Sequence, residues 1–198
     1  MTQLRVAGAA LNQIPIDWRN NLTNIKEAID QAREQAVDVL CLPELTLCGY
    51  GCEDMFLSDW LYERCLEKLE EIRTYTSGIT LAVGLPMKYE GHNYDVSCLV
   101  SNQDILGFTA KQFLAEDGVH YEPRWFRPWP ADRQVQIEIN GKSYPFGDVM
   151  YELHGIKIGF EICEDAWRNT QRPGYRLAER GVNLILNTSA SHFSFGKS

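Results

Sequence analysis

Several features are missing from this 198-residue sequence, and each absence narrows its function. It has no run of eighteen apolar residues, so we expect no membrane-spanning helix and no membrane partner. Its first residues lack the long apolar stretch of a secretory signal, which predicts a cytoplasmic protein. Basic residues are not in excess either. The net charge is −8, whereas a nucleic-acid partner usually requires a basic face.

The six cysteines show no disulfide or zinc framework. Disulfide frameworks belong mainly to small secreted domains, whereas this chain is long enough to bury a core without them. Cys48 and Cys52 are close in sequence, but no second Cys or His pair follows at zinc-site spacing. We therefore expect no metal site, and we expect most of the cysteines to be small buried apolar side chains.

The hydrophobic pattern predicts an α/β protein with a mixed sheet, because strand–helix–strand units at both ends flank hairpins in the middle. Helices are expected to begin at Asn20 or Asn21, after Ser58 and near Tyr175. The irregular segment 116–134 is predicted to be a long surface excursion with a functional role. Strands, the first of them buried, are expected at 4–10, 37–42, 79–85, 94–100, 105–109, 135–139, 144–146, 156–162 and 182–187.

Three polar residues follow predicted strands directly: Glu44, Lys111 and Cys163. The strand ends of α/β sheets are where such proteins usually place their sites. Taken singly, each residue has a common structural explanation. The glutamate could be a helix cap, the lysine a solvated surface charge, and the cysteine an inert packing residue.

Together these residues could perform acyl transfer. A thiol has an ordinary pKa of about 8.5, so it needs a base or a positive charge to attack at neutral pH. The two acidic residues that follow Cys163 are expected to raise its pKa further. Glu44 could take the thiol proton and later return it to a leaving amine. Lys111 could balance the charges and donate to the developing oxyanion, so the pattern predicts a thioester mechanism.

Two other chemistries have weaker support. A cysteine–histidine pair would use His192, the best placed of the four histidines, but no Gly-x-Cys-x-Gly elbow surrounds Cys163. The segment 196–198 (Gly-Lys-Ser) resembles the end of a phosphate-binding loop. That loop needs a small flexible residue five positions earlier, where this chain has Ser191 in a stretch of bulky aromatics. We therefore reject a phosphate-binding loop.

Three segments resemble the motifs of the nitrilase superfamily of carbon-nitrogen hydrolases. Residues 42–50 (Leu-Pro-Glu-Leu-Thr-Leu-Cys-Gly-Tyr) are similar to its glutamate motif, and Lys111 with 121–126 (Tyr-Glu-Pro-Arg-Trp-Phe) to its lysine segment. Residues 156–167 (Ile-Lys-Ile-Gly-Phe-Glu-Ile-Cys-Glu-Asp-Ala-Trp) are similar to its nucleophile segment. The resemblance implies an α-β-β-α sandwich with mixed sheets, in which the glutamate, lysine and cysteine form a catalytic triad.

A finer resemblance is to the glutaminase domains of glutamine-dependent NAD synthetases, through 49–54, 163–165 and 187–191. It implies hydrolysis of glutamine without a cofactor. The ammonia would pass to a separate synthetase domain that uses ATP and Mg to amidate deamido-NAD. A free-standing amidase acting on another small amide, or a non-catalytic interaction module, remains an alternative.

The same resemblance implies three substrate-binding residues. Glu122 would position the substrate amide, and Glu164 and Ser191 would contact the glutamine head group. Glu164 has an alternative role as a helix cap, where the helix dipole favours a carboxylate, although Asp165 could serve there equally well.

The resemblance also bears on domain organisation. Residues 1–198 are expected to form a single carbon-nitrogen hydrolase domain, truncated at its C-terminus because the family's domain continues beyond the strand near Asn187. The synthetase domain is expected to be absent from this chain. Unpaired edge strands would then be a solubility hazard. By family analogy we also expect a homo-oligomer.

Overall fold

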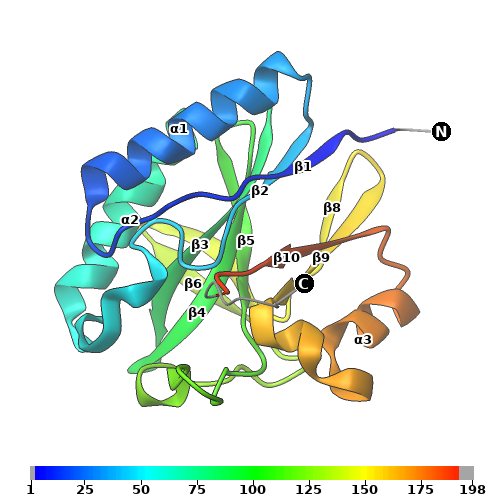
Figure 1. The fold of residues 1–198 in the computed structure, drawn as a ribbon. Helices are drawn as coiled ribbons and strands as arrows, with labels where there is room; N and C mark the ends of the chain where they lie inside the picture. The colour runs from blue at the N-terminus through cyan, green and yellow to red at the C-terminus, as the bar shows by residue number, and fades with distance from the viewer. Residues whose placement is uncertain (1–2, 192–198) are drawn as a thin grey trace.

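The computed structural model describes residues 3–191, which form two β-sheets between outer layers of helices (Figure 1). Helices α1 (Trp18–Glu34) and α2 (Asp59–Thr74) cover the larger sheet, and α3 (Pro173–Glu179) lies on the side of the smaller sheet. Short 3-10 turns complete the described helices: η1 (Tyr50–Leu57), η2 (Glu122–Arg124), η3 (Cys163–Trp167) and η4 (Asn169–Gln171). The predicted α-β-β-α sandwich is confirmed.

The larger sheet has the order β1-β2-β3-β4-β5-β7-β6, and the smaller has the order β10-β9-β8. The larger sheet consists of β1 (Val6–Gly8), β2 (Val39–Cys41), β3 (Thr80–Tyr89), β4 (His92–Ser101), β5 (Asp104–Ala110), β6 (Gln134–Ile139) and β7 (Lys142–Gly147). The smaller sheet consists of β8 (Tyr151–Leu153), β9 (Ile156–Ile162) and β10 (Leu184–Thr188).

Both sheets are mixed, as the sequence predicts. Strands β1, β2 and β3 are parallel because helices connect them, and β9 and β10 are parallel for the same reason. Strands β3 and β4 form an antiparallel hairpin across Glu90 and Gly91, whose φ values of 47° and 75° suit a tight two-residue turn.

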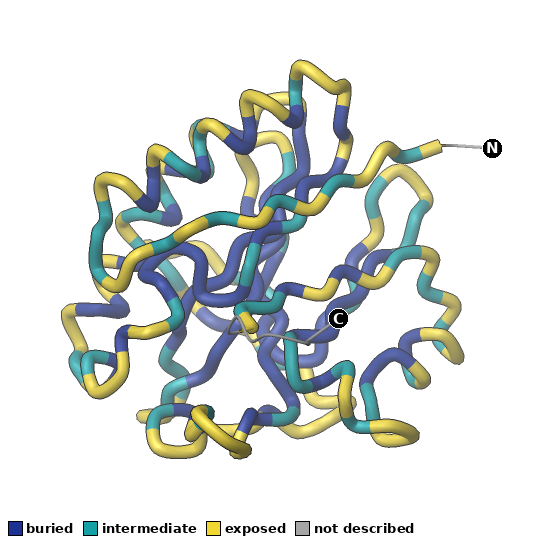
Figure 2. The backbone as a smooth tube through the Cα atoms, viewed as in Figure 1, coloured by how far each residue is buried: buried dark blue, intermediate teal, exposed yellow. Residues whose placement is uncertain are grey.

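Alternating side chains along the central strands divide the core into two parts. Leu40 and Leu81 face α1 and α2, whereas their neighbours Val39 and Ala82 face the smaller sheet. In the smaller sheet the inner face includes Ile158, Phe160 and Leu186, which pack in the same cluster as Val39, Ala82 and Leu99. Figure 2 shows this buried centre as a continuous dark region that runs through the strands.

The N-terminal strand is shorter and more exposed than predicted. The sequence indicates a buried strand over 4–10, but β1 has three residues and Val6 is 42% exposed. The prediction of burial was wrong because β1 is an edge strand. The end strand β10 of the smaller sheet is similar, with Ile185 36% exposed.

Segment 116–134 is not simply the predicted surface excursion. Glu122, Phe126 and Trp129 within it are 1%, 3% and 1% exposed. The Trp129 ring lies 5.1 Å from that of Tyr94 and 4.9 Å from that of Phe146, and its indole N–H donates to a backbone carbonyl. The segment therefore returns to the core, because its aromatic rings fill the space beside β4 and β7.

Helix α1 starts earlier than Asn20 or Asn21. Its N-cap is Asp17, which accepts a hydrogen bond from the Asn20 N–H. Asn21 instead is fully buried and bonds to both the backbone N–H and the carbonyl of Ile14. Helix α2 follows Ser58 as predicted. Within residues 3–191, no helix combines the length and apolarity needed to cross a bilayer.

Candidate active site

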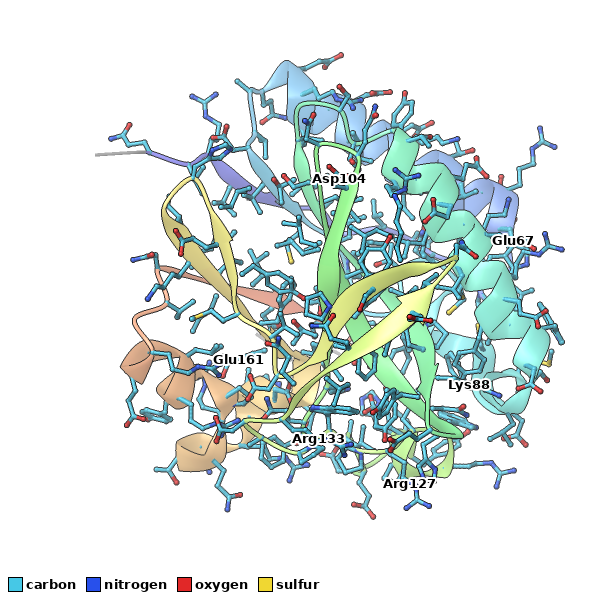
Figure 3. All side chains as sticks on the ribbon, turned by 180° about the vertical axis from the view of Figure 1, so that it is seen from behind. Glu67, Lys88, Asp104, Arg127, Arg133 and Glu161 are labelled. Carbon is cyan, nitrogen blue, oxygen red and sulfur yellow. The ribbon has the colours of Figure 1, made fainter. Side chains whose placement is uncertain are left out.

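Strand ends from both sheets deliver the predicted triad to one place. Glu44 follows β2, Lys111 follows β5, and Cys163 follows β9, and the charges of Glu44 and Lys111 both act on the Cys163 thiol. In Figure 3, Asp104, where β5 begins, lies in the upper half of the view, and Arg127, which follows β5 in the chain, lies near the lower edge. The site therefore lies at the carboxyl end of β5.

Lys111 is the centre of a buried charge cluster. Its Nζ lies 2.5 Å from Oε1 of Glu44, and 2.8 and 2.7 Å from the two oxygens of Glu122. Asp95 Oδ2 lies 3.7 Å away. Burial disfavours the ammonium, but the surrounding carboxyl groups outweigh it, so the Lys111 pKa stays well above its usual value. The ammonium is charged at neutral pH.

Glu44 is held as a carboxylate. Lys111 binds one of its oxygens, and the backbone N–H of Ala190, just after β10, donates to the other at 3.1 Å. Burial raises the Glu44 pKa, but the Lys111 charge and these hydrogen bonds outweigh burial, so the net pKa is lowered. An ionised carboxylate is the form that a general base requires.

The loop that carries Glu44 packs directly on β3. Gly84 makes this possible, because a Cβ there would collide with the backbone N of Leu45 and lie 2.8 Å from the Glu44 carbonyl carbon. The N–H of Leu47 donates to the Gly84 carbonyl at 3.1 Å. Glycine is therefore required at this position by close approach of two backbones.

Gly84→Ala is expected to displace Glu44 from Lys111. A misplacement of about 1 Å typically costs roughly 100-fold in rate, so we expect an amide-hydrolysing rate lowered by about that factor together with a lower Tm. Gly159→Ala in β9 is the control, because its added Cβ meets the buried side chain of Leu177 rather than backbone, so it perturbs packing away from the Glu44 loop. Equal activity in both variants would show that the Glu44 loop tolerates displacement.

Glu122 is fixed by donors from three segments. Besides Lys111, its Oε1 accepts from the Tyr50 hydroxyl at 2.6 Å, and its Oε2 accepts from the Ala115 N–H at 2.8 Å. Glu122 begins η2 within the segment that was expected at the surface, yet it is 1% exposed. A carboxylate with this many donors has a set orientation.

Cys163 is a half-buried thiol on a sharp turn. Its φ of 45° is left-handed, which is uncommon for a residue with a side chain and often marks a functional site. Burial, followed by the Glu44 carboxylate, raises its pKa to about 12, while Lys111 and a hydrogen bond with Ser189 oppose the shift. The predicted direction is right, but burial and Glu44, not the two acidic residues that follow, are the main causes.

Asp165 fastens the Cys163 turn to the segment after Lys111. Its Oδ1 accepts from the N–H groups of Gln112 and Phe113 at 3.0 and 2.7 Å, and its Oδ2 accepts from the Ile162 N–H at 2.9 Å. Burial raises its pKa to about 7 despite these donors. Asp165, not Glu164, therefore caps the turn that begins at Cys163.

Glu164 and Ser191 occupy different surroundings. Glu164 forms an ion pair with Arg168 at 2.9 Å, and its side chain is 20% exposed. Ser191 lines an open groove of about 1040 Å³ beside the site. The groove runs between the edge strands β1 and β10, and Tyr50, which binds Glu122, lies on its wall. Through Tyr50 and Ala190 the groove reaches the charge cluster.

The carboxyl groups of the cluster are close enough to hold a cation. Within the described residues, oxygens of Glu44, Asp95 and Glu122 lie within 4.8 Å of one another, a spacing that could suit a metal ion. The Lys111 ammonium lies 2.5 to 3.7 Å from these three groups. The cation of this cluster is therefore the lysine side chain itself.

The histidines and the other cysteines are placed as follows. The Tyr50 hydroxyl lies 3.4 Å from His120 Nδ1, and His154 is exposed in the turn between β8 and β9. His192 and segment 196–198 lie outside the described residues. All six cysteines are free thiols, and Cys41 is the only one besides Cys163 that is not fully buried.

Sequence reasoning missed three groups at the site: the Asp95 carboxyl, the Tyr50 hydroxyl and the Ala190 N–H. Asp95 could have been noticed as a carboxyl in a strand whose neighbours are apolar. Tyr50 stands in the glutamate motif without an assigned role. The bond from Ala190 to Glu44 crosses 146 positions and leaves no local signal.

The fold and the site define a carbon-nitrogen hydrolase, and the chain belongs to that family, whose sequence model matches residues 5–198. It is similar to the glutamine-dependent NAD(+) synthetase of Oryza sativa subsp. indica, with 34% identity over 100% of this chain and 28% of that protein. The crystal structure of a glutamine-dependent NAD(+) synthetase from Cytophaga hutchinsonii matches with a TM-score of 0.90 and 49% identity, over 99% of this chain and 32% of that one.

The fold also occurs in a smaller protein. The NitN amidase from Neterenkonia sp. AN1 matches with a TM-score of 0.76 and 20% identity, over 98% of this chain and 69% of that one. At this identity the likeness concerns the fold alone. The chain spans about a third or less of the length of the two synthetases, at 28% and 32%.

Proposed function

We propose that this chain hydrolyses the side-chain amide of glutamine and releases ammonia, as the glutaminase part of a glutamine-dependent NAD synthetase. The observation that carries the proposal is the buried Glu44–Lys111–Glu122 cluster beside the Cys163 thiol. The similarity to two synthetases over nearly the whole chain supports glutamine as the substrate.

The first step is attack by sulfur on the amide carbon. Because the Cys163 pKa is raised to about 12, the sulfur is a thiol at neutral pH, and Glu44 takes its proton as the carbon–sulfur bond forms. An ammonium has three protons. One of those on Lys111 binds Glu44 and one lies between the Glu122 oxygens, which leaves the third for the oxyanion.

The second step releases ammonia. The carbon–nitrogen bond breaks as Glu44 returns the proton to the leaving nitrogen, and the acyl group stays on Cys163 as a thioester. Glu44 then takes a proton from water, which attacks the thioester carbon and releases glutamate. The thiol is restored when that proton returns to sulfur, so the cycle is balanced without a cofactor.

The released ammonia would pass to a synthetase domain, where ATP and Mg support the amidation of deamido-NAD. We propose the synthetase domain as a partner because the chain covers only 28% and 32% of the two synthetases. We also propose self-association. Trp167 and Tyr175, 73% and 56% exposed on the side of α3, support it because large exposed aromatics are common at interfaces.

Glutamine is selected, in this proposal, through its charged head group. Glu164 binds the α-ammonium, Ser191 donates or accepts at the same group, and Glu122 orients the side-chain amide. Glu164→Gln is then expected to lower kcat/KM for glutamine about 10- to 100-fold, the usual cost of losing a charged hydrogen bond. The rate on a simple amide or activated ester without the α-ammonium should change little.

The control for this test is Glu179→Gln, which removes an exposed carboxylate at the end of α3. It should leave both substrates unaffected. Glu164 already pairs with Arg168, so a purely structural role predicts equal losses on the two substrates. Equal losses would remove Glu164 from substrate selection, and hydrolysis of simple amides but not of glutamine would favour another small amide as the substrate.

A further inference from the structure

Asp95 is a carboxyl group in the charge cluster that the proposed steps do not use. It lies on β4 and is 1% exposed, and its backbone carbonyl accepts the Lys111 N–H at 2.9 Å. Neither side-chain oxygen has a hydrogen-bond donor in the described part of the chain. A buried ionised carboxylate without a donor is costly, so its protonation state needs an explanation.

The charges around Asp95 favour a neutral group. Its Oδ2 is 3.7 Å from Lys111 Nζ, beyond hydrogen-bond distance. With Glu44 and Glu122 ionised, the single ammonium already faces two carboxylates. A third would leave two uncompensated negative charges in a site that is almost sealed from water. The titratable groups that face Asp95 are Glu44, Lys111, Glu122, Cys48 and Tyr62.

We propose that Asp95 is a protonated carboxylic acid whose O–H donates to the Glu44 carboxylate, and that it thereby keeps Glu44 ionised and oriented as the base. Oxygens of the two carboxyl groups lie within 4.8 Å of each other, and such a pair can form a hydrogen bond only when one holds a proton. Burial and the Glu44 charge raise the Asp95 pKa well above its usual value, whereas the Glu44 pKa is lowered.

The hydrogen-bonding capacity of Glu44 fits this role. A carboxylate offers about four acceptor positions. Lys111 and the Ala190 N–H use one on each oxygen, which leaves positions for Asp95 and for the Cys163 thiol. Asp95 is thus a positioning residue that acts through Glu44. The effect of Asp95 on catalysis rests on the proposed glutaminase function, whereas the protonation state of Asp95 is independent of that function.

The proton can be tested without activity. The infrared spectrum of the full-length protein at neutral pH should contain the carbonyl band of a protonated carboxylic acid that is lost in Asp95→Asn. Asp165, whose pKa is about 7, is present in both proteins and cancels in the difference spectrum. A carboxylate band lost in its place would overturn the proposal.

The pH profile tests the role. Asp95→Asn keeps a neutral donor of the same shape. Its kcat/KM for glutamine should therefore stay within about threefold of that of the unmodified protein, and the acidic limb of the pH profile of kcat/KM should not shift. Asp95→Val removes the donor. Because a donor to the charged form lowers a pKa, its loss raises the Glu44 pKa. The acidic limb should then move up by about one pH unit, and kcat/KM should fall about 10- to 100-fold.

Two outcomes would contradict this role. If Asp95 were ionised, Asp95→Asn would remove a negative charge and move the acidic limb to lower pH. If Asp95 were only structural, Asp95→Val would lower Tm and leave the limb of the remaining activity in place. Should Asp95→Val fail to fold, the infrared spectrum and the Asp95→Asn profile still decide. Absence of glutamine hydrolysis in the unmodified protein would contradict the proposed function. The infrared spectrum would still show whether Asp95 is protonated.

Discussion

Cys163→Ala is expected to abolish glutamine hydrolysis, with a loss of about 10⁶-fold, because removal of a nucleophile from a unit that acts together eliminates the covalent route. The fold should survive. Cys163 is half-buried, and a small-for-small change at such a position usually alters stability by about 1 kcal/mol or less. Ammonia release and Tm, measured together, check the prediction.

Cys41 provides a matched control, because it is also free and half-buried at a strand end, and burial raises its pKa to about 12. Cys41→Ala should retain activity. Cys163 should also react with a thiol-specific electrophile faster than Cys41, since Glu44 can take its proton. Near-normal ammonia release from a stable Cys163→Ala protein would show that the triad assignment is wrong.

Lys111→Met is expected to lower kcat by two to three orders of magnitude, since losing an oxyanion donor typically costs about 2.7–4 kcal/mol in the barrier. KM should change less. The variant also leaves Glu44 and Glu122 buried without their cation, which typically destabilises a protein by about 3–5 kcal/mol. Because the Lys111 charge lowers the Glu44 pKa, its loss should move the acidic limb of the rate profile upward.

Lys88→Met is the control for that substitution. Lys88 pairs with Asp59, the first residue of α2, and its side chain is 33% exposed (Figure 3). A surface ion pair contributes about 0–1 kcal/mol, so activity and stability should both be nearly unchanged. A Lys111→Met protein with normal kcat and a raised KM would remove Lys111 from the chemistry and leave it a role in binding.

The strand-end positions of Glu44, Lys111 and Cys163 could be predicted because each follows an apolar run whose period is visible locally. Burial could not be predicted in the same way. Val6 belongs to such a run but lies on an edge strand, whereas Trp129 belongs to an irregular segment that folds back against β4 and β7. An apolar pattern shows that a segment can be covered, but the tertiary arrangement decides whether it is.

The contacts that tune the site were the least predictable. Asp95 and Glu122 are polar residues whose partners come from other strands and loops, so their protonation and orientation depend on the assembled fold. Motif resemblance assigned a role to Glu122 and none to Asp95. The difference reflects what a motif records, which is residue type and order, and not the electrostatic balance of a buried cluster.

The bond from Ala190 to Glu44 makes the position of the proposed base depend on how the two sheets are docked. Glu44 follows β2 of the larger sheet and Ala190 follows β10 of the smaller one. The hydroxyls of Ser97 and Thr188 form a hydrogen bond between the same two sheets at 2.6 Å. A slide of one sheet over the other by a single ångström would weaken the bond to Glu44 while both sheets kept their own hydrogen bonds. In the proposed mechanism, activity therefore depends on the register between the two sheets, and it can be lost while the secondary structure is still intact.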